Sequence, residues 1–378
     1  MKKRVLLVMP QYEIGGITVS LYSFLSMIDP NRLQVDVFAS PHGPYKGKMP
    51  NCQELPENIW LSYPMVNGSY WVKVFQTAVY GLRFALSKIH INLFPLIDWI
   101  GGKSIHSDKY DAVVCFSEGL AYTVCSFPAK KLVQWIHCDY KRHLKDNNPE
   151  FERYAYKRYD TVVCVSDFVK GVFSEIYPEF ASKAIAIHNV INVEDICAKA
   201  KSFEDFDERF NTDVFTIVSC GRLDPVKQFS KIPEIALEIK AKSDKDFRWY
   251  IIGGGFPEEQ RKIEMEIEKY GLGNIVILLG PKTNVYPYIA KANLYVCTSQ
   301  SESFPLVVNE AKALCVPVIS NNFPSVYESI EEGVDGFVVP LEKMSDKIID
   351  YMDNPLVINH CRIDNTEAIE SFYKVFEA

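Results

Sequence analysis

The sequence predicts an α/β fold made of two doubly wound parallel sheets, each with the alternating pattern of a Rossmann-like domain. Three observations predict this class. The chain has 378 residues, which allows two domains at about 150 residues each. Short continuous apolar runs alternate with helical segments, as expected of parallel strands covered on both faces. A charged stretch near residues 192–213 separates two such series.

The first series starts at the N-terminus, where an apolar run leads into helical spacing from Ile17 to Met27. We expect buried strands at 4–9, 34–39, 111–116, 131–136, 161–166 and 183–188. These strands define an N-terminal domain over residues 1–190, and a linker follows over 191–212.

The second series has the same rhythm. We expect strands at 214–220, 248–253, 274–280, 292–299, 316–320 and 336–340, with helices such as 257–270 and 305–314 between them. They define a C-terminal domain over 213–357. The last segment, 358–378, should contain a helix from about Asn365 to Glu377 that packs back on the first domain.

Composition excludes several classes of protein. Apolar residues are 48% and charged residues 24%, which is ordinary for a globular chain. No apolar run reaches the roughly 18 residues of a membrane-spanning helix. The ten cysteines include no Cys-x-x-Cys pair, which favours a reduced, cytoplasmic protein over a zinc cage. A nucleic-acid partner is not expected.

Charge is unevenly distributed along the chain. Residues 1–190 hold 21 Lys and Arg against 17 Asp and Glu, whereas the remainder holds 20 against 31. This asymmetry either arises by chance or marks a surface for anionic partners in the first half.

The segment 60–107 departs from the strand–helix alternation because it mixes aromatic and cationic side chains at helical spacing. It is either a helix that covers the sheet or a membrane-interface, lipid-acceptor surface at the inner face of the cytoplasmic membrane. The residues concerned are Trp71, Lys73, Phe75, Tyr80, Arg83, Phe84, Lys88 and Trp99.

Glycines follow two of the predicted strands. Gly15-Gly16 precedes a helix, and Gly253-Gly254-Gly255 follows the strand at 248–253. Glycine lets a ligand approach the backbone closely, and a helix N-terminus attracts anions. Neither run has the G-x-G-x-x-G spacing of a dinucleotide fold, and each by itself is more often a tight turn between a strand and a helix.

Two cations lie just past the strand at 214–220. Arg222 and Lys227 are five residues apart, at the carboxyl end of a strand, where ligands bind in open α/β sheets. An Arg fork and a Lys point charge can together hold a diphosphate. The alternative is a pair of solvated surface charges.

The segment 298–320 carries two glutamates, Glu302 and Glu310, around a predicted helix start at Pro305. The free amides near Leu306 and Val307 could hold phosphate oxygens. The carboxylates could accept hydrogen bonds from vicinal sugar hydroxyls.

The pairing of GRLxxxK at 221–227 with Glu302 and Glu310 resembles the retaining glycosyltransferases of family 4, of the polysaccharide-assembly type. The resemblance covers about 215–340 and reaches the first half through Gly15-Gly16 and residues 135–141. It implies the GT-B fold, in which two Rossmann-like domains face a cleft.

The resemblance also implies roles. Arg222 and Lys227 would neutralise the diphosphate, Glu310 would bind ribose, and Glu302 would bind the transferred sugar. His137 would lie beside the anomeric carbon, although a histidine ending an apolar run is also often a satisfied core residue. The remaining donor-binding positions implied are Gly15, Gly16, Gly253, Pro281, Lys282, Ser303, Phe304, Pro305, Leu306 and Val307.

The sequence departs from the family pattern at three places near the site. Pro305 replaces a common glycine, and Gln228 stands where glycine often follows the lysine. The usual glycine-rich loop before Glu328 reads Asn322-Phe323-Pro324-Ser325-Val326-Tyr327. These departures leave the donor sugar open.

We therefore expect a metal-independent enzyme without a cofactor, which transfers a hexose or N-acetylhexosamine from a nucleotide sugar, expected to be a UDP-sugar, to a lipid-linked bacterial surface glycan. Asp205-Phe206-Asp207 is interpreted as a solvated charge run in the linker, not a metal site. The alternatives are an inverting GT-B transferase, a nucleotide-sugar epimerase, or a sugar-binding protein without turnover.

Overall fold

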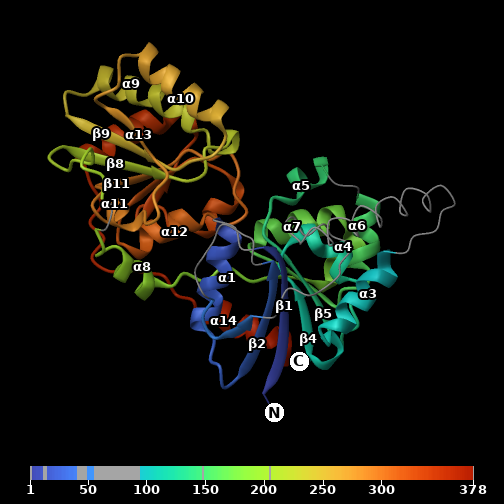
Figure 1. Cartoon of the computed structure of the whole chain (residues 1–378). Coiled ribbons are helices and arrows are strands. Elements are labelled where there is room, and N and C mark those ends of the chain that lie inside the picture. The colour runs from blue at the N-terminus through green and yellow to red at the C-terminus, as the bar shows by residue number, and fades with distance from the viewer. Residues whose placement is uncertain are drawn as a thin grey trace, which may run out of the picture. The chain divides into compact units, whose positions relative to one another are not determined.

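The computed structural model describes residues 2–11, 15–40, 49–54, 94–146, 149–203 and 206–377. The chain divides into two compact units. The N-terminal unit comprises Met1–Val190 and Thr366–Ala378, and the C-terminal unit comprises Ile191–Asn365. Figure 1 shows the elements of each unit in chain order.

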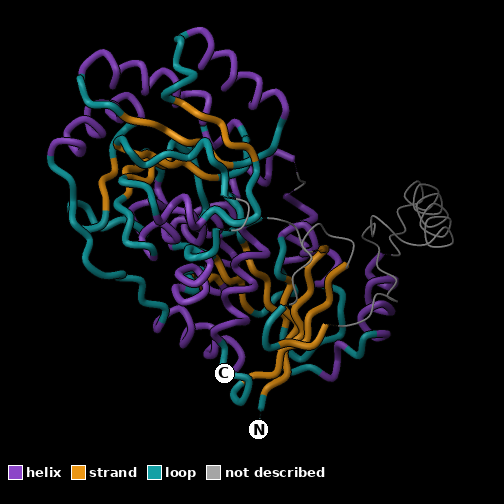
Figure 2. Tube along the Cα trace, turned by 60° about the vertical axis from the view of Figure 1, so that its left-hand side comes forward, coloured by secondary structure: helices purple, strands orange, loops and turns teal. Residues whose placement is uncertain are grey.

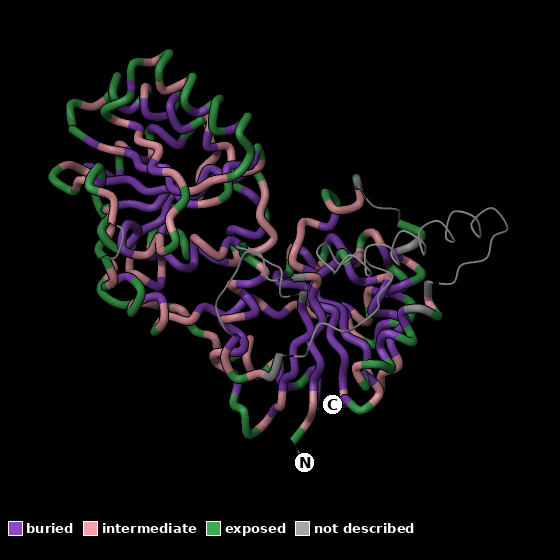
Figure 3. The backbone as a smooth tube through the Cα atoms, viewed as in Figure 1, coloured by how far each residue is buried: buried purple, intermediate pink, exposed green. Residues whose placement is uncertain are grey.

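The N-terminal unit is built on a parallel sheet. Seven strands are found in the described ranges, in the order β3-β2-β1-β4-β5-β6-β7. Their bounds are β1 Lys3–Gln11, β2 Leu33–Ser40, β3 Cys52–Glu54, β4 Ala112–Cys115, β5 Leu132–Ile136, β6 Thr161–Cys164 and β7 Ala184–Ala186. The central strands are buried along their length (Figure 3), as expected of a parallel sheet with both faces covered.

The strands of this sheet form the centre of the unit, and helices lie on either side of them (Figure 2). The α-helices described in this unit are α1 Gly16–Met27, α3 Phe94–Ser104, α4 Ala121–Val124, α5 Tyr140–Asp146, α6 Pro149–Tyr156, α7 Asp167–Ile176 and α14 Thr366–Glu377. A short 3-10 helix, η2 Glu118–Leu120, follows β4.

The final helix, α14, packs into the core of the N-terminal unit. The Phe372 ring lies 5.3 Å from that of Phe24 in α1 and 5.8 Å from that of Trp135 in β5. Arg32 adds a cation–π contact, with its guanidinium 3.6 Å from the ring centre of Tyr373. A helix that follows the whole C-terminal unit in sequence thus completes the apolar layer on this sheet.

The C-terminal unit repeats the plan. Its described strands form a parallel sheet of six, in the order β10-β9-β8-β11-β12-β13. The bounds are β8 Phe215–Cys220, β9 Phe247–Ile252, β10 Val276–Gly280, β11 Leu294–Cys297, β12 Val318–Ser320 and β13 Gly336–Val338. The α-helices described in this unit are α8 Val193–Lys199, α9 Ile232–Lys242, α10 Pro257–Lys269, α11 Tyr286–Ala290, α12 Leu306–Ala313 and α13 Met344–Asp353.

Neighbouring residues of each strand serve opposite faces of this sheet. Ile217 and Trp249 lie in one apolar cluster, and Val218 and Tyr250 lie in the other. Side chains alternate across a strand, so an uninterrupted apolar run supplies two cores at once. The predicted doubly wound α/β class is therefore confirmed.

The predicted linker is wrong in part. Residues from Ile191 onward belong to the C-terminal unit, and α8 packs against α11 and α12. The amide side chain of Asn365 donates to the carbonyl of Ile191 and accepts from its N–H, both at 2.9 Å. The segment 358–378 likewise divides, because residues up to Asn365 belong to the C-terminal unit and α14 to the other.

The segment 60–107 lies mostly outside the described residues, and α3 is the part of it that the structure gives. Across the described ranges, every helix is too short or too polar to span a bilayer.

Removing the anchor of α14 should destabilise the N-terminal unit. Because Phe372 is buried against Phe24 and Trp135, we expect Phe372→Ala to cost about 3–5 kcal/mol in the free energy of unfolding. Lys374→Ala, at an exposed position of the same helix, should stay within about 0.5 kcal/mol of the wild type. Urea unfolding followed by circular dichroism measures both, and equal midpoints would contradict the packing.

Candidate active site

Four of the predicted site residues meet at the carboxyl edge of the C-terminal sheet. Arg222 and Lys227 follow β8, whereas Glu302 follows β11 and Glu310 lies in α12. Strands β8 and β11 are neighbours, so the loops that leave them emerge side by side. This edge is where open parallel sheets bind ligands.

Lys227 and Glu302 form an ion pair at the centre of this edge. Lys227 Nζ donates to Glu302 Oε1 at 2.5 Å, and Ser299 Oγ donates to the same oxygen at 2.7 Å. Burial by itself lowers the pKa of an ammonium, but the Glu302 carboxylate outweighs it and the pKa of Lys227 is raised. The ammonium is therefore charged, and its other N–H donors can serve an anion.

Backbone contacts hold the two loops together. Thr298 Oγ1 donates to the carbonyl of Lys227 at 2.7 Å, and the N–H of Gln300 donates to the carbonyl of Val226 at 2.7 Å. Gln228 adopts the left-handed conformation, with φ of 53°, which explains why glycine is favoured at this position. These contacts fix the direction in which Lys227 leaves its loop.

Arg222 combines exposure with an anchor. Its side chain is 68% exposed, and Nη2 lies 3.0 Å from Oδ2 of Asp224, which is buried. Asp224 Oδ1 in turn accepts the Val226 N–H at 3.0 Å and caps the 3-10 helix Pro225–Lys227. Arg222 and Lys227, the two cations predicted to bind a diphosphate, thus each form an ion pair with a carboxylate of the protein, those of Asp224 and Glu302.

The glycine run after β9 supports the Arg222 loop by close backbone packing. Gly253 has φ of 155°, and a Cβ there would lie 1.8 Å from the Gly221 carbonyl oxygen. A Cβ on Gly255 would lie 2.6 Å from the Leu223 carbonyl oxygen. Loop packing alone requires these glycines, so a contact of Gly253 with the donor stays a prediction.

The start of α12 corrects one expected phosphate contact. The Leu306 N–H donates to the Phe304 carbonyl at 2.9 Å, so the chain itself uses this amide. Val307 follows in the first turn, where helix amides lack partners within the helix, and stays the predicted phosphate donor. Phe304 and Leu306 also pack against the apolar cluster of Ile191, Ile196 and Ala313. Pro305 precedes the helix, and Ser303 is half-buried beside it.

Glu310 is a buried carboxylate in α12, and it is 6% exposed. The Tyr286 hydroxyl donates to its Oε1 at 3.1 Å. Burial raises the pKa of Glu310 to about 7, although the Tyr286 hydrogen bond and the charges of Lys199 and Lys227 act in the opposite direction. Its charge state therefore changes near neutral pH.

Lys282 is engaged away from the predicted donor contacts. Its Nζ lies 2.7 Å from Asp207 Oδ2, and both side chains are mostly buried. Arg209 also pairs with Asp207, and its hydrogen bond, with that of Lys282, holds the pKa of Asp207 well below its usual range. The interpretation of Asp207 as a solvated charge is therefore wrong, while Asp205 lies outside the described residues. Pro281 lies against Gly254.

His137 lies in the N-terminal unit, directly after β5. Its Nε2 is buried and makes no hydrogen bond to any described atom, and its ring lies 4.5 Å from that of Phe116. Burial lowers the pKa of His137 to about 4, although the charge of Glu118 raises it. The imidazole is neutral at pH 7 with one ring nitrogen unsatisfied, which differs from a satisfied core histidine.

Gly15 precedes α1 in extended backbone, with φ of 174°. A Cβ at this position would meet no atom of the described residues within 4 Å, and Gly16 begins the helix. The approach of a ligand to Gly15 and Gly16 stays a prediction.

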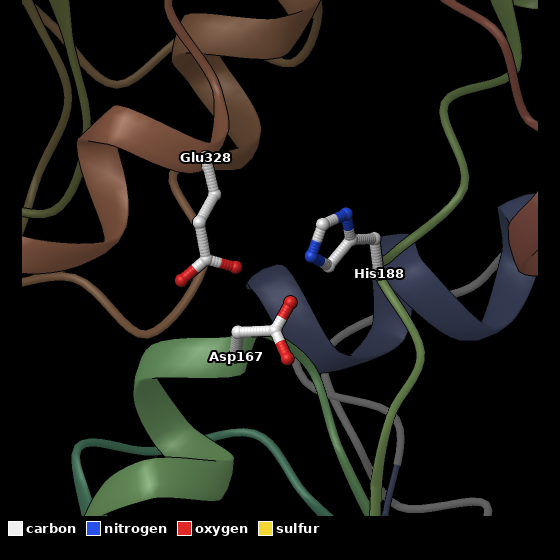
Figure 4. Close-up of side chains that lie close together, drawn as sticks. All are labelled: Asp167, His188 and Glu328. Atoms are coloured by element: carbon white, nitrogen blue, oxygen red, sulfur yellow. The ribbon is translucent and has the colours of Figure 1, made fainter.

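The sequence analysis missed polar residues at this edge of the N-terminal sheet. Glu118 follows β4, Asp167 begins α7 after β6, and His188 follows β7. Figure 4 shows the side chains of Asp167 and His188 turned toward each other, with ligand atoms within 4.8 Å. The third labelled residue, Glu328, belongs to the C-terminal unit. A position within about three residues of the end of a strand was the signal that could have found Glu118, Asp167 and His188.

Comparisons with known proteins agree with this architecture. The HepE protein of Anabaena, solved with UDP, superposes with a TM-score of 0.73 and 16% identity over 99% of both chains. The doubly wound sheets are thus of the GT-B class. The Glycosyltransferase Family 4 model matches residues 14–195, and the Glycosyl transferases group 1 model matches 200–368. The chain belongs to the GT-B glycosyltransferases of this family, as the motifs predicted.

Two sequence relatives illustrate the range of the family. An uncharacterized glycosyltransferase of Methanocaldococcus jannaschii is 28% identical over 209 residues, which are 54% of this chain and 53% of that protein. The chain thus spans about half the length of this relative. The Campylobacter jejuni N-acetylgalactosamine-N,N'-diacetylbacillosaminyl-diphospho-undecaprenol 4-alpha-N-acetylgalactosaminyltransferase is 26% identical over 41% of this chain and 40% of its own.

The raised pKa of Glu310 predicts a pH-dependent stability. The folded-state pKa of about 7 exceeds the ordinary 4.5, so the stabilisation by Glu310 is complete below about pH 4.5 and lost as pH rises through 7. We expect Glu310→Gln to gain up to about 3 kcal/mol relative to the wild type between pH 5 and pH 8.

Denaturant unfolding at both pH values measures this difference. Glu268→Gln, which changes an exposed carboxylate of α10, is the matched control and should follow the wild type. Parallel pH profiles for Glu310→Gln and the wild type would contradict the raised pKa.

Proposed function

We propose that the protein is a retaining, metal-independent glycosyltransferase that moves a hexose or an N-acetylhexosamine from a UDP-sugar to a hydroxyl of a lipid-linked bacterial glycan. The observation that carries this proposal is the Lys227–Glu302 ion pair, with Arg222 on the same loop as Lys227. It combines fixed positive charge for a diphosphate with a carboxylate for sugar hydroxyls. The UDP bound in the HepE structure supports the choice of nucleotide.

The proposed donor contacts follow from the chemistry of each group. Lys227 and Arg222 face the two phosphates, and the Val307 amide adds a donor from the helix start. Ionised Glu310 accepts hydrogen bonds from the ribose hydroxyls, and Glu302 accepts them from the transferred sugar. Lys227 donates a hydrogen bond to Glu302. The residue proposed to bind the diphosphate therefore also orients the carboxylate proposed to bind the transferred sugar.

Charge stabilisation of the leaving diphosphate is the proposed source of catalysis. As the bond between the anomeric carbon and the phosphate oxygen breaks, negative charge grows on the diphosphate. Lys227 and Arg222 are already in place for it, so no reorganisation is needed at that moment. In this proposal these two cations do the work that a divalent metal does in other transferases.

Retention requires the acceptor to attack on the face from which the diphosphate leaves. The new bond joins the anomeric carbon to the acceptor oxygen, and the hydroxyl proton passes to the departing phosphate oxygen. The buried, neutral His137 is proposed to lie on the acceptor side. The diphospho-undecaprenol in the Campylobacter relative's name supports a lipid-linked acceptor.

A membrane contact through α3 is the proposed route to such an acceptor. Leu96, Trp99 and Ile100 are 55%, 45% and 53% exposed, and Lys103 follows one turn further on the same face. The opposite face packs closely, since a Cβ on Gly102 would lie 2.9 Å from Phe127. An exposed apolar stripe ending in a cation suits an anionic lipid surface.

The donor site is tested by its cations. We expect Arg222→Ala and Lys227→Ala each to lower kcat/KM for transfer by at least about 10²-fold, because each removes charge stabilisation of the leaving group. Lys231→Ala, which changes a nearby exposed lysine paired with Glu234, should leave kcat/KM unchanged. Circular dichroism checks that the variants fold. Normal kinetics in both site variants would remove these cations from the mechanism.

The same assay tests stereochemistry and metal dependence. Transfer from a panel of UDP-, GDP- and ADP-sugars identifies the donor, and NMR of the product gives its anomeric configuration. We expect retention and full activity in excess EDTA. An inverted product, or a loss with EDTA that Mg²⁺ restores, would refute the corresponding part of the proposal.

Membrane contact is tested by sedimentation with vesicles of phosphatidylglycerol and phosphatidylcholine. We expect recovery with the vesicles at low salt and release near 1 M salt, where the Debye length falls to about 3 Å. Serine at Leu96, Trp99 and Ile100 together should abolish recovery. Serine at Met265 and Val357, which are 66% and 78% exposed on the C-terminal unit, should not. Equal recovery of both variants would exclude α3.

A further inference from the structure

Glu118 makes an unusual contact at the carboxyl edge of the N-terminal sheet. Its Oε1 accepts hydrogen bonds from two consecutive backbone amides, those of His137 and of Cys138, the second at 2.8 Å. Glu118 follows β4, and the two amides follow β5, the neighbouring strand. The carboxylate is 8% exposed, so these bonds form in a poorly solvated environment, where charge-assisted hydrogen bonds are strong.

The imidazole of His137, next to this contact, has a ring nitrogen without a hydrogen-bond partner among the described residues. Among described atoms, His137 Nε2 has no partner although it is buried. Phe116 confines the ring from one side at 4.5 Å, and Trp135 is parallel to it at 6.4 Å. A buried nitrogen without a partner carries a free-energy cost, and a substrate hydroxyl that reached Nε2 would remove it.

We propose that Glu118 is a positioning residue for transfer: by holding the amides of His137 and Cys138, it fixes the turn that presents His137 Nε2 to a substrate hydroxyl. This inference rests on the proposed function and adds a residue to it. Glu118 acts through His137 and does not itself touch the reacting atoms.

A second carboxylate, Asp160, binds a backbone amide at the other end of β5 and serves as the control. Asp160 Oδ2 accepts the Leu132 N–H at 2.7 Å, at the start of β5. Both carboxylates thus hold backbone amides of one strand, but Asp160 holds its amino end, away from the edge where ligands bind. If Glu118 only secured the strand, the two residues would behave alike in every assay.

The test compares Glu118→Ala, Glu118→Gln, Asp160→Ala and His137→Ala in the full chain. Glutamine keeps an oxygen that can accept both amides, so Glu118→Gln should keep kcat within about 5-fold of the wild type. Glu118→Ala should lower kcat about 10–100-fold, the usual scale for a lost orienting contact. The affinity for UDP should stay unchanged in both variants, because the proposed donor contacts come from the C-terminal unit. Asp160→Ala should leave kcat unchanged.

A double-mutant cycle separates positioning from other roles. If Glu118 acts through His137, Glu118→Ala should have no further effect on kcat in the His137→Ala background. Additive losses would overturn the proposal. A loss in Glu118→Gln as large as that in Glu118→Ala would do the same, because it would assign the effect to the carboxylate charge.

Failure of the proposed function gives a different result. If the wild type neither hydrolyses nor transfers any UDP-sugar, the enzyme assignment fails, and the Glu118 contact is judged on the imidazole ¹⁵N signals of His137, identified by their loss in His137→Ala. We expect these signals to shift in Glu118→Ala and to remain near the wild-type position in Glu118→Gln and Asp160→Ala. Unchanged signals in Glu118→Ala would overturn the inference.

Discussion

The ion pair between Lys227 and Glu302 is the interaction on which the C-terminal site depends. It joins residues 75 positions apart in sequence and lies where two neighbouring parallel strands end. Removing one partner of a mostly buried pair leaves an uncompensated charge, which typically costs about 3–5 kcal/mol. Loop contacts through Thr298 and Gln300 keep the pair in register. Before any ligand binds, the positive charge of Lys227 is balanced by the negative charge of Glu302. The N–H donors of Lys227 are therefore already oriented when a diphosphate binds.

The two units fix a loop at the carboxyl edge of the sheet by different contacts. In each, a carboxylate after one strand fixes the loop after its neighbour. Glu302 does so by binding an ammonium, and Glu118 by binding two backbone amides. The first arrangement keeps a cation at the site, whereas the second leaves a neutral ring with an unsatisfied nitrogen. Fixed charge suits a leaving diphosphate, and a neutral hydrogen-bonding group suits a hydroxyl.

Sequence periodicity predicted every described strand except β3, because an apolar run in a parallel sheet serves both faces. The helix expected at 305–314 is observed at Leu306–Ala313, and the one at 257–270 ends one residue earlier. Arg222, Lys227, Glu302 and Glu310 could be named because they follow strands within a recognisable motif. Contacts between residues that are distant in sequence produce no local sequence pattern. The Lys282–Asp207 pair and the contact of Glu118 with the amides after β5 arise from tertiary packing, so they were missed.

The position of α14 determines the order in which the chain can finish folding. Synthesis runs from the N-terminus, so every strand of both sheets leaves the ribosome before Phe372 does. The C-terminal unit has all its residues by Asn365 and can complete its two cores at that point. The apolar surface of Phe24 and Trp135 must wait for the last helix to cover it. The N-terminal unit, which is synthesised first, is thus the last to complete its core.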